Sequence, residues 1–292
     1  MTTRKAILLA GGKGSRLNPI TLAISKQLMP IYDKPMIYYP LSTLMLAGIK
    51  EYLIITSPDQ LSSFKKLLGD GKLLGINIEY AIQNHPDGIA QALIIGEKFL
   101  NKSPSILMLG DNLFHGNELL PKLKIANEKK EGATIFAYPV SNPSRYGVVE
   151  FDKKANVISL EEKPKNPKSR YAVTGIYFFD NTASNKAKEI KPSSRGELEI
   201  TSINELYLAE KKLDVQIMRR GMAWLDTGTF DSLNEAGDYI RALEKRQGLK
   251  IGSPEEVAWR NGWITNKDLK GLANKFKSSD YGKYLLDLLK MK

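Results

Sequence analysis

The stretch that decides the fold of this 292-residue chain is LLAGGKGSRLNP at residues 8–19, an apolar run that ends in a glycine-rich loop. A second stretch, SKQLMPIYDKP, follows at residues 25–35. The glycines let backbone N–H groups approach a phosphate chain with no Cβ in the way, and Ser15 adds a hydroxyl donor. Arg16 supplies a guanidinium fork for phosphate oxygens, and Lys26 supplies a second cation. The combination predicts a polyphosphate-binding loop.

Two familiar nucleotide-binding motifs do not fit this loop. A Rossmann fingerprint needs a third glycine where this chain has Leu17, and the spacing of a Walker A loop is absent. A mobile glycine turn with no ligand is the remaining alternative, and the nearby cations disfavour it.

Short apolar runs alternate with helical patterns over the first part of the chain. The predicted strands are 4–10, 52–57, 76–82 and 105–109, and the predicted helices are 35–48, 59–68 and 88–100. Such alternation predicts βαβ units and a mostly parallel sheet, with ligands bound beyond the carboxyl ends of the strands. Candidate site residues are therefore expected at 11–16, 57–59, 83–88 and 110–112.

The pattern changes from about residue 133, where strands are joined by tight turns. These strands predict an antiparallel extension that forms a second wall of a cleft. After Asp231 the chain is predicted to be helical to its end, and Ser253-Pro-Glu-Glu matches a capping box at the start of one helix.

The composition narrows the class of protein. The chain has no cysteine, which excludes disulfides and thiol chemistry, and no apolar run approaches the length that spans a membrane. We expect a soluble cytoplasmic protein. The net charge of +11 has no block of like charges typical of a nucleic-acid tail, and roughly half of the surplus follows residue 240. Solvated helix faces explain it most simply, and a strongly anionic substrate is the alternative.

Longer blocks carry a resemblance to a known family. The loop pattern L-A-G-G-x-G-[ST]-R-L followed by S-K-Q-L-x-P resembles the signature of the sugar-1-phosphate nucleotidyltransferases. QNHPDGIAQA, LGDNLFHG, RYGVVEFD, SLEEKP, YAVTGIYFFD, RGELEIT and AWLDTGT resemble the branch that acts on glucose 1-phosphate, in the same order. The resemblance runs from about residue 4 to the C-terminus.

The resemblance implies an α/β, Rossmann-like three-layer fold with a mixed, mostly parallel central sheet, a small antiparallel extension and a helical C-terminal segment. We expect a catalytic core at 1–240, with a nucleotide-binding part at about 1–130 and a sugar-phosphate part at about 131–240. The helical segment 241–292 is expected to pack on the core as a possible assembly or regulatory region.

The implied reaction is an attack of glucose 1-phosphate on the α-phosphorus of dTTP, giving dTDP-glucose and pyrophosphate with Mg²⁺. It needs no covalent enzyme intermediate, so positioning and charge neutralisation must carry catalysis. Arg16 and Lys26 are the expected transition-state cations. Asp111 and Asp226 each follow an apolar run, and the residues alone favour a turn cap as much as a metal ligand; the resemblance assigns both to Mg²⁺.

The resemblance also assigns the substrate contacts. The expected nucleotide-binding residues are Leu9, Gly11, Gly12, Gly14, Ser15, Arg16, Lys26, Gln83, Gly88 and Asp111. A glutamine amide donates and accepts at once, matching a pyrimidine edge, so UTP could serve as well as dTTP. Without the family, residues 83–88 indicate only a polar turn. The expected sugar-phosphate residues are Asn112, Tyr146, Gly147, Glu162, Lys163, Val173 and Arg195, although E-E-K-P alone is typical of a solvated turn.

Family members are homotetramers with a second, regulatory nucleotide site, where a dTDP-rhamnose-type end product of polysaccharide synthesis inhibits. The matching residues here are Arg220, Lys250, Glu256 and Arg260, and a salt-bridged surface helix is an equal alternative. The chain departs from the family at Lys13, Ser202 and Ser253. Rival hypotheses are a pyrophosphorylase for another nucleotide and sugar, and a basic nucleotide- or nucleic-acid-binding regulator without turnover.

Overall fold

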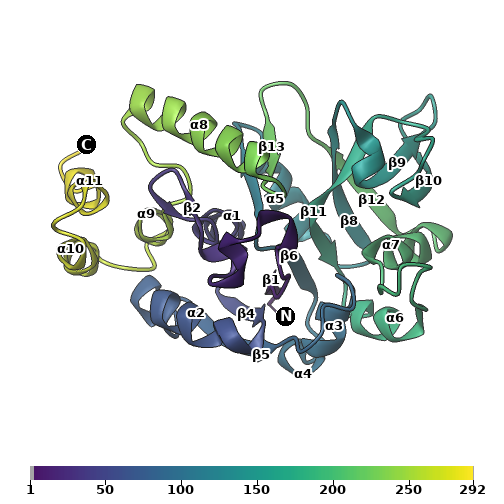
Figure 1. The fold of residues 1–292 in the computed structure, drawn as a ribbon, viewed down its shortest axis with the longest axis horizontal. Helices are drawn as coiled ribbons and strands as arrows, with labels where there is room; N and C mark the ends of the chain where they lie inside the picture. The colour runs from purple at the N-terminus through teal and green to yellow at the C-terminus, as the bar shows by residue number, and fades with distance from the viewer. Residues whose placement is uncertain (1–2, 292) are drawn as a thin grey trace.

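A nine-stranded mixed sheet forms the centre of the computed structural model, which describes residues 3–291 (Figure 1). Along the main path the strand order is β10-β9-β11-β6-β1-β4-β5, and β8 and β12 continue from β11. The predicted mixed sheet is confirmed.

The parallel part of the sheet comes from the first 109 residues. Its strands are β1 (Lys5–Ala10), β4 (Glu51–Thr56), β5 (Asn77–Ile82) and β6 (Ser105–Leu109). β1 pairs in parallel with both β4 and β6, and β4 pairs in parallel with β5. All four agree with the predicted runs to within a residue. β1, β4 and β6 are buried, β-branched or leucine-rich segments, and the edge strand β5 alternates exposed Asn77 and Glu79 with Ile78 and Tyr80.

Helices follow these strands as expected, with shifted ends. α1 spans Tyr38–Leu46 and α2 spans Leu61–Leu68. The predicted helix 88–100 is wrong in detail: it begins only at Gln91, as α3 (Gln91–Ile95), and continues after Gly96 as α4 (Glu97–Leu100). Its first residues instead form a loop in which the Ala90 N–H donates to the Leu198 carbonyl at 3.1 Å.

The antiparallel part of the sheet is built around β11 (Tyr171–Phe179), which pairs antiparallel with β6, β8 and β9. Its neighbours are β8 (Ala133–Pro139), β9 (Gly147–Phe151), β10 (Val157–Glu162) and β12 (Leu213–Ile217). The pairing of β11 with β8 shifts between Val173 and Tyr177. This irregularity frees backbone groups of β11 at the edge of the site described below.

Two small ladders lie outside the main sheet. β2 (Pro30–Ile31) pairs with β3 (Lys34–Pro35), and β7 (Asn112–His115) pairs antiparallel with β13 (Ala223–Asp226). The second ladder was not predicted from the sequence, because its strands are short and far apart in the chain. It places Asp226 directly opposite Asn112.

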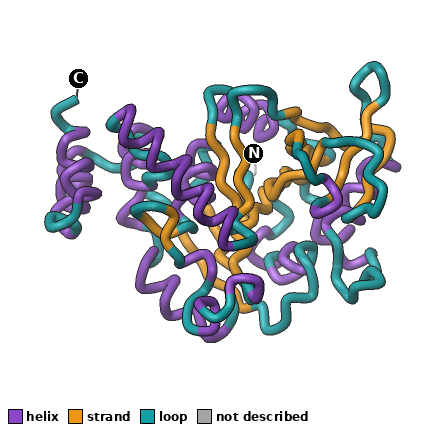
Figure 2. The backbone as a smooth tube through the Cα atoms, turned by 45° about the horizontal axis from the view of Figure 1, so that its top comes forward, coloured by secondary structure: helices purple, strands orange, loops and turns teal. Residues whose placement is uncertain are grey.

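Helices cover both faces of the sheet, which gives the expected three layers (Figures 1 and 2). Side chains of β1 alternate between the two cores, with Ala6 and Leu8 in one and Ile7 in the other. The first core also receives α1, α2, α5 (Leu119–Glu128) and the last three helices of the chain, while Ala236 and Ile240 belong to a separate small cluster with Ile31. The second receives α3, α4, α6 (Ala183–Glu189) and α7 (Ile200–Ala209).

The end of the chain is helical, as predicted. Its helices are α8 (Phe230–Gln247), α9 (Pro254–Arg260), α10 (Asn266–Lys275) and α11 (Asp280–Leu288). The Ser253 side chain accepts from the Glu256 N–H and caps α9, but the predicted capping box is only half formed. The Glu256 carboxylate instead bonds Arg260 and Tyr284.

Among residues 3–291, every helix is too short or too polar to cross a lipid bilayer.

Candidate active site

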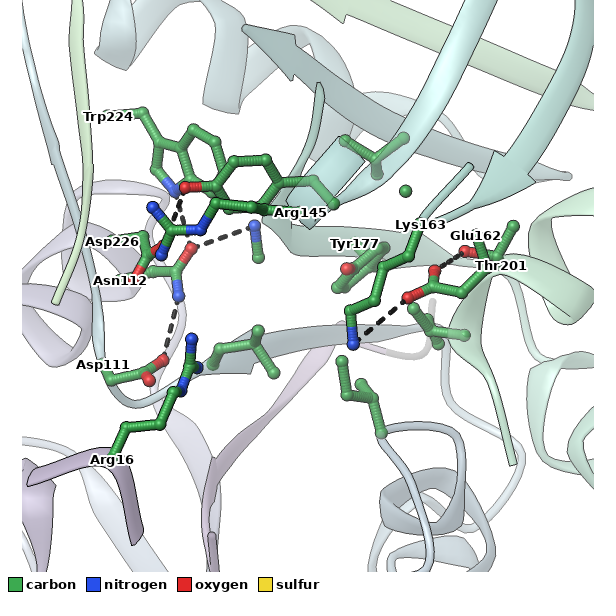
Figure 3. A pocket seen from close by; sticks show the side chains of 17 residues that line it. Arg16, Asp111, Asn112, Arg145, Glu162, Lys163, Tyr177, Thr201, Trp224 and Asp226 are labelled. Atoms are coloured by element: carbon green, nitrogen blue, oxygen red, sulfur yellow. Dashed lines mark hydrogen bonds and ion pairs between the residues drawn. The ribbon is translucent and has the colours of Figure 1, made fainter. Parts of the chain in front are cut away.

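A cavity of about 330 Å³ opens where the strands of the sheet end (Figure 3). It is lined by residues from both the parallel and the antiparallel parts of the sheet. Nine predicted site residues are among them: Arg16, Asp111, Asn112, Tyr146, Gly147, Glu162, Lys163, Val173 and Asp226. The fold therefore brings residues up to 210 positions apart to one place.

Asp111 follows β6 directly and forms an ion pair with Lys26. The Lys26 Nζ lies 2.6 Å from Asp111 Oδ2, and the lysine side chain is only 6% exposed. Burial alone would raise the pKa of Asp111, but the charge and hydrogen bond of Lys26, together with the Asn112 amide, hold that pKa below its usual value. Asp111 is thus an anion that already faces the cavity.

Asn112 is held in one orientation by two donors. The Trp224 Nε1–H donates to Asn112 Oδ1 at 2.6 Å, and the Gly175 N–H donates to the same oxygen at 3.1 Å. The Gly175 N–H is available because the pairing of β11 shifts there. The amide nitrogen must then point the other way, and it donates to Asp111 Oδ1 at 2.9 Å. Asn112 therefore orients the Asp111 carboxylate, and its own side-chain oxygen already accepts two hydrogen bonds within the protein.

Asp226 ends β13 on the same side of the cavity. The Tyr146 hydroxyl donates to Asp226 Oδ2 at 2.8 Å, and the Gly228 N–H donates to Oδ1 at 2.5 Å. The Arg145 guanidinium lies 3.4 Å from Oδ2. Burial, and then the neighbouring Asp226 charge, raise the pKa of Tyr146 to about 12. The tyrosine is consequently a permanent donor to this carboxylate near neutral pH.

Glu162 and Lys163 lie across the cavity from the two aspartates (Figure 3). The Thr201 hydroxyl donates to Glu162 Oε2 at 2.5 Å, and the Lys163 Nζ lies 3.7 Å from Oε1. Arg195 contacts Glu162 Oε1 at 3.3 Å but also bonds Glu199 at 2.7 Å. Arg195 is not among the cavity-lining residues, so its guanidinium contacts the Glu162 carboxylate without lining the cavity itself.

A second cavity of about 350 Å³ lies beside the glycine-rich loop. Gly11, Gly12, Ser15 and Gln83 line it together with Lys13. Gly14 faces inward instead, and its carbonyl accepts from Thr21 at 2.9 Å. The Leu9 carbonyl is likewise occupied, accepting from the Gly110 N–H at 2.8 Å.

Gln83 and Gly88 are both placed by close backbone approaches. A Cβ on Gly11 would lie 2.3 Å from Gln83 Oε1, so the glycine makes room for this amide. Gly88 has φ +115°, and a Cβ there would lie 2.4 Å from the Leu198 carbonyl oxygen. Gly88 is therefore required by the packing of its loop on Leu198, whatever it contributes to a ligand.

Three of the four predicted regulatory residues line another cavity, of about 270 Å³, between α1, α5 and α9: Lys250, Glu256 and Arg260. Lys250 pairs with Asp33 and Glu244, and Arg260 Nε lies 2.7 Å from Glu256 Oε1. Arg220 lies in the turn before β13 and is not among the lining residues.

Several residues of the site were not singled out from the sequence. Arg145, Thr201 and Trp224 line the first cavity, and Gln91 bonds Gln83. Each lies within one of the sequence stretches quoted above as resembling the family, and that resemblance was the only signal that could have identified it. The residues that they contact gave no local sequence pattern.

Known proteins resemble this chain over most of its length. Residues 5–242 match the family model described as nucleotidyl transferase, so the chain belongs to that family. Within it, the chain is similar to proteins named glucose-1-phosphate thymidylyltransferase. One from Neisseria meningitidis serogroup A is 55% identical over 98% of this chain and 99% of its own length. One from Mycobacterium tuberculosis strain H37Rv is 55% identical over the same shares.

Solved structures show the same fold. A Bacillus anthracis structure assigned to glucose-1-phosphate thymidylyltransferase, in complex with sucrose, has a TM-score of 0.76 at 40% identity, covering 82% of this chain and 96% of its own. A UDP-glucose pyrophosphorylase complexed with UDP-glucose has a TM-score of 0.72 at 23% identity, covering 84% and 100%. At that identity the second likeness concerns the fold alone.

Proposed function

We propose that this protein transfers a thymidylyl group from dTTP to glucose 1-phosphate, giving dTDP-glucose and pyrophosphate. The observation that carries the proposal is one cavity with two carboxylates on one wall and Glu162 with Lys163 on the other, adjoining the glycine-rich loop. The relatives with this name match almost the full chain, which supports the same activity.

The cofactor proposed is Mg²⁺, held by Asp111 and Asp226. Their oxygens are the hard ligands that this ion prefers, and Mg²⁺ is commonly held by one or two carboxylates together with substrate phosphates. When bound, the ion would neutralise phosphate charge. The β7–β13 ladder supports a shared ligand set, because it aligns Asp226 with the residue next to Asp111.

The first cavity is proposed to hold the sugar phosphate. The Glu162 carboxylate accepts from sugar hydroxyls, Lys163 neutralises the attacking phosphate, and Gly147 and Val173 supply backbone contacts. Tyr146, Asn112 and Arg195 act mainly by positioning the carboxylates they bond. Because the acceptor phosphate needs no proton removed from a hydroxyl, orientation and charge compensation are the main demands.

The second cavity is proposed to hold the nucleotide. The backbone of the glycine loop and Ser15 bind the triphosphate, and Gln83 binds the pyrimidine edge. Arg16 belongs to the loop, yet its side chain lines the first cavity. That position suits a cation that contacts the phosphates leaving as pyrophosphate, while Lys26 lies beneath Asp111 near the transferring group.

We further propose a cytoplasmic homotetramer that feeds dTDP-rhamnose-type polysaccharide synthesis, with a core at 1–240 and the segment 241–292 in assembly or regulation. Lys250, Glu256 and Arg260 would form the regulatory nucleotide site. Lys250 is held by Asp33 and Glu244, and Arg260 is held by Glu256, which supports a cavity organised before any ligand arrives. Loss of end-product inhibition in Arg260→Ala, with unchanged basal turnover, is the expected result.

A substrate panel tests the proposed activity. Purified protein is assayed for Mg²⁺-dependent pyrophosphate release with dTTP, UTP, dCTP and dATP, each with glucose 1-phosphate and with galactose 1-phosphate. The dTTP and glucose 1-phosphate pair should give the highest kcat/KM. A higher value with UTP would assign a uridylyltransferase instead, and salt-sensitive DNA binding without pyrophosphate release would contradict an enzyme role.

A further inference from the structure

Three side chains form a hydrogen-bonded chain behind the nucleotide cavity. The Gln83 Nε2 donates to Gln91 Oε1 at 2.6 Å, and the Gln91 Nε2 donates to Asp87 Oδ2 at 2.9 Å. Gln91 is the first residue of α3, and Asp87 lies in the loop that precedes it. Gln83 is only 4% exposed, so few other partners are available to it.

The direction of this chain is fixed at its Asp87 end. An ionised carboxylate only accepts hydrogen bonds, so the Gln91 group facing it must be the amide nitrogen. The backbone N–H of Asp87 adds a second constraint, because it donates to Gln91 Oε1 at 3.3 Å. Both contacts leave the Gln91 oxygen as the acceptor for Gln83. The Gln91 amide is thereby held in one of its two possible orientations, and the Gln83 nitrogen must face the Gln91 oxygen.

The fixed orientation determines what Gln83 offers to a ligand. One Nε2 proton is used by Gln91, and the Oε1 atom lies against Gly11 at the wall of the nucleotide cavity. Gln83 therefore presents an acceptor oxygen and one remaining N–H. A thymine or uracil edge carries an imide N–H beside a carbonyl oxygen, which matches that pair. In the same position, cytosine has the N3 acceptor where thymine has the imide N–H, and the N4 amino donor where thymine has the O4 carbonyl. Both contacts with Gln83 would then be opposed.

We infer that Gln91 and Asp87 are positioning residues that set the base specificity of the site, by holding Gln83 in the orientation that accepts an imide N–H. The inference rests on the proposed use of Gln83 for base recognition and deepens it. Thymine and uracil nucleotides are accepted and cytosine nucleotides rejected. The discrimination is thus set by two residues that do not themselves contact the base.

A variant that reverses the direction of the hydrogen bond between residue 91 and Gln83 tests this inference. In Gln91→Lys the introduced ammonium pairs with Asp87 and can only donate, so Gln83 must rotate and turn its nitrogen toward the base. The ratio of Kd for dCTP to Kd for dTTP, measured by calorimetry, should fall by about tenfold or more. The same ratio of kcat/KM values should follow. A ratio unchanged in a variant that melts as the wild type does would overturn the inference.

A matched control keeps the direction of the chain. In the double variant Asp87→Asn with Gln91→Glu, the negative charge moves from position 87 to position 91. The asparagine donates to the glutamate, and the glutamate still accepts from Gln83. The preference for dTTP should stay within about threefold of wild type. A fall as large as that in Gln91→Lys would show that packing, and not amide orientation, sets the preference.

Binding and turnover separate this inference from the proposed function. A wild-type protein that binds dTTP in preference to dCTP but releases no pyrophosphate would contradict the proposed activity while leaving the inference in force. A protein with turnover and no preference between the two nucleotides would contradict the inference alone.

Discussion

The two cavities of the site are organised by different means. The cavity proposed for the sugar phosphate is built from side chains that are already bonded to one another, as Asn112 is to Trp224 and Asp226 is to Tyr146. The cavity proposed for the nucleotide is lined on one side by the glycine-rich loop with exposed Lys13 and Ser15. Its other side carries polar side chains that are bonded to neighbours, as Gln60 is to Asp59 and Gln83 is to Gln91. Polar groups fixed before reaction cost little reorganisation when charge develops. The difference indicates that the polar groups around Asp111 and Asp226 are preorganised, and that the glycine-rich loop binds its ligand mainly through backbone N–H donors.

The largest effect should come from the carboxylate wall. Asp226→Asn keeps the shape and can still accept from the Gly228 N–H through its one amide oxygen, while its amide nitrogen can donate to the Tyr146 hydroxyl oxygen. It removes the negative charge proposed to hold Mg²⁺. We expect kcat to fall by about a thousandfold with the melting temperature little changed. Asp238→Asn on the exposed face of α8 is the control. Full activity of Asp226→Asn at saturating Mg²⁺ would exclude the metal role.

The second prediction concerns Arg16, which belongs to the glycine-rich loop but whose side chain lines the cavity with Asp111 and Asp226. Arg16→Ala removes a cation proposed to stabilise the transition state, so kcat should fall by roughly a hundredfold, corresponding to about 2.7 kcal/mol or more. Lys13→Ala, which removes a cation from the other cavity, should change KM for the nucleotide and leave kcat nearly unaltered. A rise in KM alone for Arg16→Ala would instead indicate uniform binding.

Tyr146 measures how much one orienting hydrogen bond contributes. Tyr146→Phe deletes the hydroxyl that donates to Asp226 and should lower kcat/KM by about tenfold, since bonds to charged groups are stronger than average. Its pKa of about 12 keeps the hydroxyl protonated. The ratio of variant to wild-type activity should therefore be constant from about pH 6 to pH 9. Tyr138→Phe, which also packs edge-on against Trp224, is the matched control.

The smallest effect concerns acid stability. Burial opposes ionisation of Asp111, but Lys26 and the Asn112 amide lower its pKa in the folded state. A lowered pKa stabilises the fold above the unfolded value of about 3.9, and this contribution is lost as pH falls through the folded value. Lys26→Met should move the acid-unfolding midpoint, followed by circular dichroism, to higher pH.

Lys13→Met provides the control for acid stability. It makes the same charge change at an exposed position with no carboxylate partner among the ion pairs of residues 3–291. Equal shifts in the two variants would show that net charge, and not the Lys26–Asp111 pair, governs acid unfolding.

Much of the fold could be predicted because its signals are local. The parallel strands β1, β4 and β6 are buried apolar runs, and the edge strand β5 alternates polar and apolar residues over its first half. The polar residues at the ends of these strands follow within one to three positions. Asp111 and the glycine loop were found in this way. α9 was also placed correctly by Ser253 and Pro254.

The features that could not be predicted depend on distant partners. β13 has four residues, and its pairing partner β7 lies more than a hundred positions earlier. Glu256 was expected to complete a capping box, but the Tyr284 hydroxyl, 28 positions later, donates to its carboxylate. Thr201 bonds Glu162 across 39 positions. None of these pairings leaves a periodic pattern in the residues themselves.

The β7–β13 ladder has a consequence for how such a protein can change. Asp226 is aligned with Asn112 at one end of the ladder, while the chain between the two strands leaves and re-enters at the other end, where His115 is opposite Ala223. Insertions or deletions in that connecting chain therefore begin away from the carboxylates. The walls proposed to contact the sugar can be remodelled for a different acceptor while the spacing of Asp111 and Asp226 is inherited unchanged.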